Sequence, residues 1–374
     1  MIDADAARNW VVKVGSALLT DHGTGISADA LDEWCRQIAA LSTAGKRVVL
    51  VSSGAVAEGC RRLGFDVRPR TIHELQAAAA VGQSGLIEAY EQAFRRYERR
   101  IALVLLTHDD LADRERYLNA RTTLNTLLDF GVVPVVNEND SVATDEIKLG
   151  DNDTLAGMVT SLLSADLLVL LTDRDGFHEA DPRTHPDAPV VREAPAADKR
   201  LDAMAGAVAG SLGRGGMVTK LAAARSAARS GAHTVIAHGR SRDVLLKLAR
   251  GESVGTLLTA DLAPLDARKR WIAEQLRAKG ELCVDLGARH AIIHRGVSLL
   301  PAGVTDATGA FRRGDMVRVL DPDGVEIAKG LANYDAVEVR KLIGRKSADI
   351  ASVLGYVDEP EVVHRDNLVV SAGR

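Results

Sequence analysis

Aromatic residues are scarce in this sequence, since Phe, Trp and Tyr together make up 3% of its 374 residues. The core must therefore be built mainly from Ala, Val and Leu, as in parallel sheets covered by helices. The three cysteines are far apart in the sequence, which excludes a disulfide framework and a zinc site of clustered cysteines. The net charge of −4 gives no electrostatic reason to expect a nucleic-acid binder.

Long hydrophobic runs are also missing. Uncharged stretches such as residues 75–87 are shorter than the ~18 apolar residues that a membrane helix needs. The first apolar run contains Lys13 and follows Asp3 and Asp5, which is unlike a signal peptide. We therefore expect a cytoplasmic protein that does not cross a membrane.

The sequence alternates short apolar runs with longer helical patterns over residues 1–262. This alternation predicts a mainly parallel β-sheet with helices on both faces, a three-layer α/β/α sandwich. Strands are expected at residues 10–14, 47–51, 101–106, 132–136, 167–171 and 234–237. Helices are expected at residues 28–44, 72–97, 114–130, 153–164 and 217–230.

The pattern changes after residue 262, so the chain is long enough, and varied enough, for a second domain. Residues 263–279 are expected to be a connector, residues 280–360 a small, mostly β domain, and residues 361–374 a C-terminal tail. Short β-like runs are expected at residues 282–286, 291–294, 316–320, 326–328 and 336–340.

Polar residues follow four of the predicted strands. The four clusters are Lys13-Val14-Gly15-Ser16, Ser52-Ser53-Gly54-Ala55, Asn137-Glu138-Asn139-Asp140 and Thr172-Asp173. Because the carboxyl ends of parallel strands lie at one edge of a sheet, we expect these clusters to line a single ligand-binding crevice. Taken singly, the Ser and Gly pairs could equally be tight strand-to-helix turns with a good N-cap.

Two further segments precede predicted helices. Residues 213–220 read Gly-Arg-Gly-Gly-Met-Val-Thr-Lys, which predicts a phosphate cradle of backbone amides and a lysine, with a flexible linker as the alternative. This segment is not a Walker A loop. Residues 150–153 read Gly-Asp-Asn-Asp, more polar groups than one N-cap requires. They could orient lysines or bind an amine, whereas a calcium loop would need a terminal Glu.

Taken together, these segments resemble the amino-acid kinase family, in register over residues 10–260, and residues 280–360 resemble a PUA domain. The resemblance implies transfer of a phosphoryl group from ATP to the γ-carboxylate of L-glutamate, the first step of proline biosynthesis. The catalytic residues it implies are Lys13, Lys220 and Asp153, and the glutamate-binding residues are Ser53, Asp140 and Asn152. The ATP-binding residues would be Lys13, Thr172, Asp173, Arg214, Gly215, Gly216, Met217, Val218, Thr219 and Lys220. Arg214 stands where a small residue or Thr is expected.

The resemblance also implies cofactors and partners. Mg²⁺ would be held mainly by ATP phosphates and water, so no protein metal ligands are expected. The attacking carboxylate is ionised at neutral pH and needs no general base. A homo-oligomer, feedback inhibition by proline and hand-over of the product to glutamyl phosphate reductase are further expectations.

Two alternatives stay open at this point. Within the family, an acetylglutamate or aspartate kinase is the nearest one. From a different class, the PUA-like part suggests a protein that binds or modifies RNA. RNA binding is not expected, however, because residues 280–374 carry 12 Lys and Arg against 14 Asp and Glu, a net charge of −2.

Overall fold

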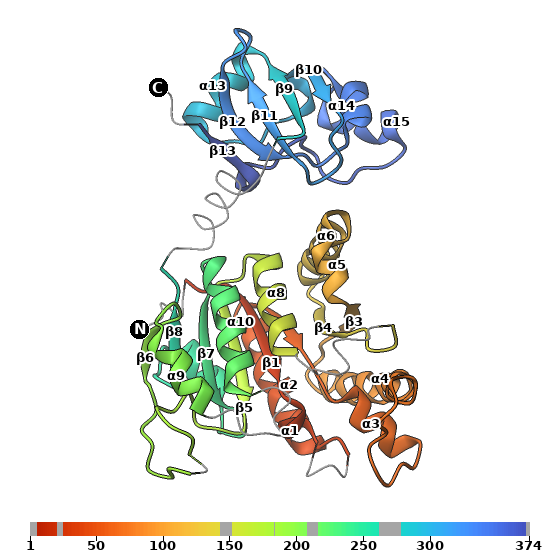
Figure 1. Ribbon diagram of the computed structural model, residues 1–374. Helices are drawn as coiled ribbons and strands as arrows, with labels where there is room; N and C mark the ends of the chain where they lie inside the picture. The colour runs from red at the N-terminus through yellow and green to blue at the C-terminus, as the bar shows by residue number, and fades with distance from the viewer. Residues whose placement is uncertain are drawn as a thin grey trace. The chain divides into compact units, whose positions relative to one another are not determined.

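The structure is a computed structural model that describes residues 6–20, 25–142, 152–182, 184–207, 216–261 and 278–371. The chain divides into two compact units, Met1–Pro264 and Leu265–Arg374 (Figure 1). Within the described residues, no helix is both long and apolar enough to cross a membrane.

The first unit is built on one sheet, which has eight strands within the described residues, in the order β3-β4-β2-β1-β5-β7-β8-β6. The strands are β1 (Asn9–Val14), β2 (Arg47–Val51), β3 (Ile101–Leu106), β4 (Val133–Glu138), β5 (Leu167–Thr172), β6 (Glu193–Pro195), β7 (His233–His238) and β8 (Thr256–Thr259). Neighbours from β3 to β7 pair in parallel, whereas β8 runs antiparallel to β7. The mainly parallel sheet is therefore confirmed.

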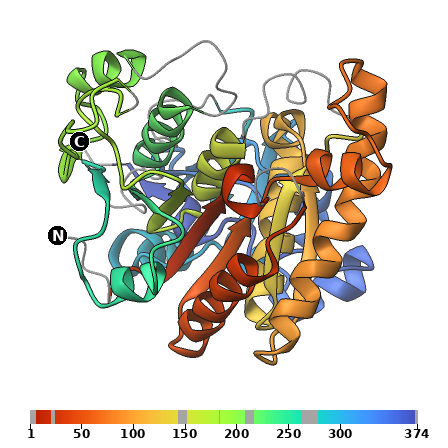
Figure 2. The same cartoon turned by 90° about the horizontal axis from the view of Figure 1, so that it is seen from below.

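Helices cover both faces of this sheet (Figure 2). One face packs against α2 (Ala28–Thr43), α4 (Ile72–Arg95) and α11 (Val244–Ala249), and the other against α6 (Arg114–Asp129), α8 (Asn152–Leu163) and α10 (Met217–Arg229). The shorter helices are α1 (Ser16–Leu19), α3 (Ala55–Arg62), α5 (His108–Ala112) and α9 (Arg200–Ala207). The three-layer sandwich is confirmed, and the predicted strands and long helices of this unit match within about two residues.

Alternation along β1 separates the two layers of core. Trp10, Val12 and Val14 pack on the side of α2 and α4, whereas Val11 packs on the side of α8 and α10. Since side chains of a strand alternate between the two faces, Lys13 lies on the same side as Val11. The register of β1 therefore places the Lys13 ammonium group beneath α8 and α10.

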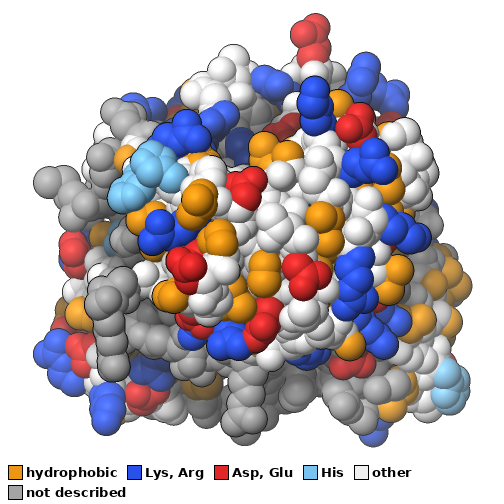
Figure 3. Space-filling model, turned by 90° about the horizontal axis from the view of Figure 1, so that it is seen from above, with side chains coloured by type: hydrophobic (Ala, Val, Ile, Leu, Met, Phe, Trp, Pro, Cys, Tyr) orange, Lys and Arg blue, Asp and Glu red, His pale blue; other side chains and the backbone are white. Residues whose placement is uncertain are grey.

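The second unit contains a sheet in the order β10-β9-β11-β12-β13. Its strands are β9 (Gly280–Val284), β10 (Val304–Gly309), β11 (Met316–Leu320), β12 (Glu326–Leu331) and β13 (Leu368–Val370), and its helices are α13 (Leu286–Arg295), α14 (Ala336–Leu342) and α15 (Ile350–Leu354). Single 3₁₀ turns lie at Pro301–Gly303, Ser347–Asp349 and Arg365–Asn367. On the face that Figure 3 shows, coloured Lys and Arg side chains are interspersed with Asp and Glu.

Two of the β runs predicted for this unit are wrong. Residues 291–294 lie in α13 and residues 336–340 lie in α14. These residues are helical despite the β propensity of Val and Ile, because each helix begins at a favourable N-cap. Asp285 accepts a hydrogen bond from the Ala288 amide at 2.7 Å, and Asp335 accepts from the Glu338 amide at 2.8 Å.

The end of the chain also differs from the expected tail. Val363 bridges to Leu299, and β13 pairs antiparallel with β12. Leu368 and Val363 are buried in the core of the second unit. Residues 362–370 are therefore part of that fold, although β13 is too short to stand out in the sequence.

Candidate active site

The strand order of the first sheet reverses at β1. Strands β2, β4 and β3 lie on one side of β1, and β5 and β7 lie on the other. In open α/β sheets, ligands bind outside the carboxyl ends of the strands at such a reversal. Here that edge carries the end of β1 at Lys13 and Val14, and the end of β5 at Thr172.

A buried charge cluster lies at this edge. Lys13 Nζ is 2.6 Å from Asp153 Oδ1, and Lys220 Nζ is 2.9 Å from Asp153 Oδ2. The three residues come from β1, α10 and α8, and their exposed fractions are 6%, 7% and 0% for Lys13, Lys220 and Asp153. The structure thus brings together the three residues for which the sequence predicts a catalytic role.

Close packing of α8 against α10 aligns the two helix starts. Gly157 of α8 faces the backbone of α10, because a Cβ at this position would lie 2.9 Å from the Ala223 carbonyl oxygen. Asp153 lies in the first turn of α8, and Lys220 lies in the first turn of α10. A side chain at residue 157 would separate the helices and the two ends of the ion pair.

The two lysines control the ionisation of Asp153. Burial alone would raise the pKa of this carboxyl, but the positive charges of Lys13 and Lys220 outweigh burial and lower the pKa to about 2. Thr219 Oγ1 lies 2.9 Å from Asp153 Oδ2 and 2.8 Å from the Gly216 carbonyl oxygen, and it can donate to one of them at a time. Asp153 therefore stays ionised at neutral pH and fixes both ammonium groups.

The cluster fits an anion better than a metal ion. One carboxylate balances two ammonium groups, which leaves an excess positive charge beside the amino end of α10. Both Asp153 oxygens already contact lysines, and the described residues contain no group of three or more His, Cys, Asp or Glu side chains that could hold a metal. The donor set therefore suits phosphate oxygens.

Three side-chain amides form a chain beside the charge cluster. Asn152 Nδ2 donates to the Ser52 carbonyl oxygen and, at 2.8 Å, to Asn137 Oδ1. Asn137 Nδ2 donates in turn to Gln83 Oε1 at 2.8 Å. We call Gln83, Asn137 and Asn152 the amide relay. It connects α4, the end of β4 and the first residue of α8, and all three members are buried.

The other predicted glutamate-binding residues lie at the same edge. Ser53 follows β2, and its hydroxyl donates to the Val14 carbonyl oxygen at 2.7 Å. Asp140 is half-buried in a turn after β4, which is closed by a hydrogen bond from the Val142 amide to the Asn139 carbonyl oxygen at 3.1 Å.

The residues predicted to bind ATP are placed in part. Thr172 ends β5, and its hydroxyl donates to Asp173 Oδ1 at 3.1 Å. Gly216 caps α10, Met217 is buried in the core, and Val218 is 49% exposed. Arg214 and Gly215 lie outside the described residues.

Sequence reasoning missed two members of the relay. Asn137 belongs to one of the four polar clusters, but nothing in its spacing assigns it a partner. Gln83 is a polar residue in an alanine-rich helical segment. Only this polarity could have drawn attention to it.

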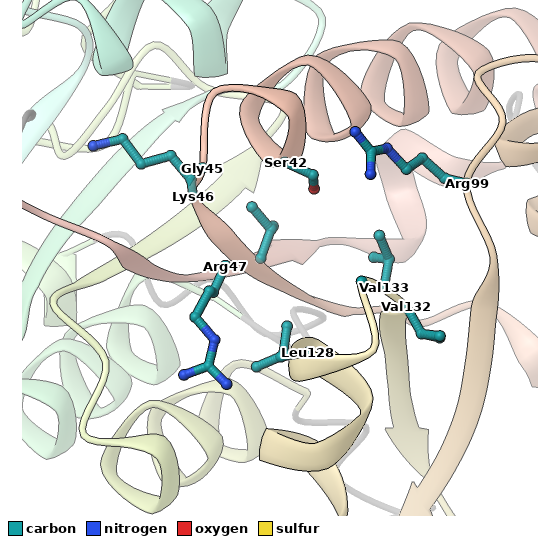
Figure 4. Close-up of a pocket in the computed structure, with 10 residues that line it drawn as sticks. Ser42, Gly45, Lys46, Arg47, Arg99, Leu128, Val132 and Val133 are labelled. Atoms are coloured by element: carbon teal, nitrogen blue, oxygen red, sulfur yellow. The ribbon is translucent and has the colours of Figure 1, made fainter.

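A separate cavity of about 170 Å³ lies at the opposite edge of the sheet, below the starts of β2 and β4 (Figure 4). Lys46, Arg47 and Arg99 contribute cations to its lining. Arg47 binds Asp129 at 2.7 Å, and Arg99 binds Thr43 at 2.6 Å. These partners end α6 and α2, whose carboxyl ends carry partial negative charge. Arg47 and Arg99 therefore stabilise the ends of these two helices.

Comparison with known proteins agrees with this geometry. The model of the family described as "Amino acid kinase family" matches residues 8–238, and that of the PUA domain matches residues 280–354. The chain therefore belongs to the amino acid kinase family and carries a PUA domain at its carboxyl end, which confirms the resemblance seen in the sequence.

Relatives over the full length have a more specific name. A protein of Thioalkalivibrio sulfidiphilus named "Glutamate 5-kinase" is 58% identical over 364 residues, 97% of this chain and 97% of the relative. A "Glutamate 5-kinase" of Variovorax paradoxus is 58% identical over 367 residues, 98% of this chain and 97% of the relative.

Proposed function

We propose that this chain transfers the γ-phosphoryl group of ATP to the γ-carboxylate of L-glutamate, giving ADP and L-glutamyl 5-phosphate. The observation that carries this proposal is the buried cluster of Lys13, Asp153 and Lys220 at the carboxyl edge of the sheet. Full-length similarity to proteins named glutamate 5-kinase supports the choice of substrate.

Lys13 and Lys220 act on the phosphoryl group in this proposal. An oxygen of the γ-carboxylate attacks the γ-phosphorus, and the bond from that phosphorus to the β–γ bridging oxygen breaks, so that ADP leaves. Negative charge shifts onto the bridging and equatorial oxygens, where two fixed ammonium groups stabilise it. Bound Mg²⁺ would add positive charge at the same phosphates. Asp153 holds the lysines in place before the reaction, so little reorganisation is needed.

The residues beside the amide relay would bind the amino-acid substrate. Asp140 offers a carboxylate to the substrate ammonium group, and Ser53 and Asn152 offer a hydroxyl and an amide. Thr172, Asp173 and residues 214–220 would bind the nucleotide. Met217 takes part through its backbone in this proposal, because its side chain belongs to the core.

Further parts of the proposal concern the whole protein. In this proposal the chain forms a homo-oligomer in the cytoplasm and catalyses a step of proline biosynthesis. Proline inhibits it, and its product is handed over to glutamyl phosphate reductase. We also propose a catalytic domain over residues 1–262, a connector over residues 263–279 and a PUA domain from residue 280. The net charge of −2 over residues 280–374 supports the expectation that RNA binding is weak.

Trapping of the acyl phosphate tests the proposed reaction. The purified chain is incubated with ATP, Mg²⁺ and hydroxylamine, together with L-glutamate, L-aspartate or N-acetyl-L-glutamate in separate reactions. Acyl hydroxamate should form with L-glutamate at a rate at least ~100-fold above the other two acids, since a site with buried polar groups rejects substrates that leave them unpaired. Faster turnover of either alternative acid would overturn the assignment.

A further inference from the structure

Gln83 is a buried polar residue in the middle of α4, and the proposed reaction gives it no role of its own. It is 9% exposed, and its Oε1 accepts the 2.8 Å hydrogen bond from Asn137 Nδ2. Its Nε2 has no hydrogen-bond partner among the described residues. The side chain therefore contributes one specific interaction, an acceptor for Asn137.

The direction of every hydrogen bond in the amide relay follows from one backbone group. The Ser52 carbonyl can only accept, so the nitrogen of Asn152 must face it. The same nitrogen faces Asn137, which must therefore present its oxygen to Asn152 and its nitrogen to Gln83. An acceptor at residue 83 is thus required to hold the side-chain amides of Asn137 and Asn152 in this orientation.

Close backbone contacts with α3 fix the position of α4 next to Gln83. A Cβ at Gly82 would lie 1.8 Å from the Ala55 carbonyl oxygen, and a Cβ at Gly59 would lie 1.6 Å from the Ala78 carbonyl oxygen. The backbones of α3 and α4 therefore touch at this turn. Because α3 begins directly after Ser53 and Gly54, the contact ties the position of Gln83 to the end of β2.

We propose that Gln83 is a positioning residue for the acidic substrate, acting through Asn137 on Asn152 at the carboxyl edge of the sheet. This inference rests on the proposed function, in which Asn152 binds the amino-acid substrate. Loss of the acceptor leaves Asn137 Nδ2 buried and unpaired and allows both asparagine amides to turn. Asp153 keeps its own three polar contacts, so the lysines stay in place.

Two substitutions at residue 83 separate the acceptor from the volume of the side chain. Gln83→Met keeps the length but removes the acceptor, and it should raise KM for glutamate ~10-fold or more, the size expected for a buried donor left unpaired. KM for ATP should stay within ~2-fold and kcat within ~3-fold. Gln83→Glu keeps an oxygen acceptor for Asn137 and replaces the unpaired Nε2 by a second carboxyl oxygen, so it should return KM for glutamate to within ~3-fold of the original chain.

Leu86→Met is the matched control for a general disturbance of α4. Leu86 lies one turn further along the helix and is fully buried in the apolar core. Both KM values should remain unchanged in this variant, and its Tm should be close to that of Gln83→Met. Substrate saturation in the hydroxamate reaction and thermal unfolding are measured for all four proteins.

The outcomes distinguish this inference from the proposed function. The unsubstituted chain reveals which acid is turned over, and the variants are then compared with that acid. Failure with glutamate would reject the proposed substrate, while a raised KM for the acid that reacts would still support the positioning role. An unchanged KM in Gln83→Met would overturn that role. So would equal KM changes for both substrates, or a Gln83→Glu variant as impaired as Gln83→Met.

Discussion

At the scale of single residues, Asp153 connects the two lysines of the proposed site. It is fully buried and forms ion pairs with both lysine ammonium groups, which come from separate elements of the fold. Buried ion pairs repay the cost of removing charges from water only when the geometry is good and further hydrogen bonds are made. Asp153 meets this condition through its two short ion pairs and Thr219.

Asp153→Asn should remove activity and lower stability. Two buried ammonium groups would then face each other without an anion, which should cost about 3–5 kcal/mol at neutral pH. Hydroxamate formation should fall by more than ~100-fold, because the lysines lose their fixed positions. Urea unfolding and the trapping assay measure the two effects, and a variant with normal turnover would contradict the role of Asp153.

The pH dependence of this stability difference has a defined sign. The folded chain holds the Asp153 pKa at about 2, below the value of about 3.9 that an aspartate has in an unfolded chain. The stabilisation is therefore fully present above the unfolded value and is lost as the pH falls through the folded value. The difference between the original chain and Asp153→Asn should be constant above about pH 5 and shrink towards about pH 2. A difference that grew on acidification would reject this explanation.

At the scale of elements, the contact between α8 and α10 aligns the two charged helix starts. Gly157→Ala inserts a methyl group against the Ala223 backbone and the Ser226 side chain. We expect a loss of about 1–3 kcal/mol from overpacking and a fall in kcat of ~10-fold, since Asp153 and Lys220 would move apart. Gly206→Ala is the control, because a Cβ there meets nothing within 4 Å. Equal kinetics for the two variants would show that the helix contact does not set the geometry.

Helices and strands of the first unit were predictable because apolar residues recur along them in a clear helical pattern or in short continuous runs. The second unit was harder, since α13 and α14 are short and depend on the capping residues Asp285 and Asp335. The position of Lys13 on the side of α8 follows from the alternation of side chains between the two faces of β1. The relay could not be predicted, because Gln83 and Asn137 are 54 residues apart and meet only when α4 packs beside β4.

At the scale of the whole molecule, every residue assigned to the site precedes position 221, whereas the PUA domain begins at residue 280. A chain that ends at residue 262 should therefore keep its phosphoryl-transfer activity within ~3-fold, since no group that acts on the transition state is removed. Hydroxamate formation by the truncated chain measures this, and circular dichroism serves as the control for folding. A folded but inactive truncation would mean that the second unit completes the active site.

The central claim is that two lysines held by one carboxylate stabilise the phosphoryl group in transit. Its most direct test is the kcat of Lys220→Ala, measured with both substrates saturating. A charge that acts in the transition state lowers kcat when it is lost, whereas a charge that only binds ATP raises KM. We predict that kcat falls by ~100-fold or more. A near-normal kcat with only a raised KM for ATP would contradict the account.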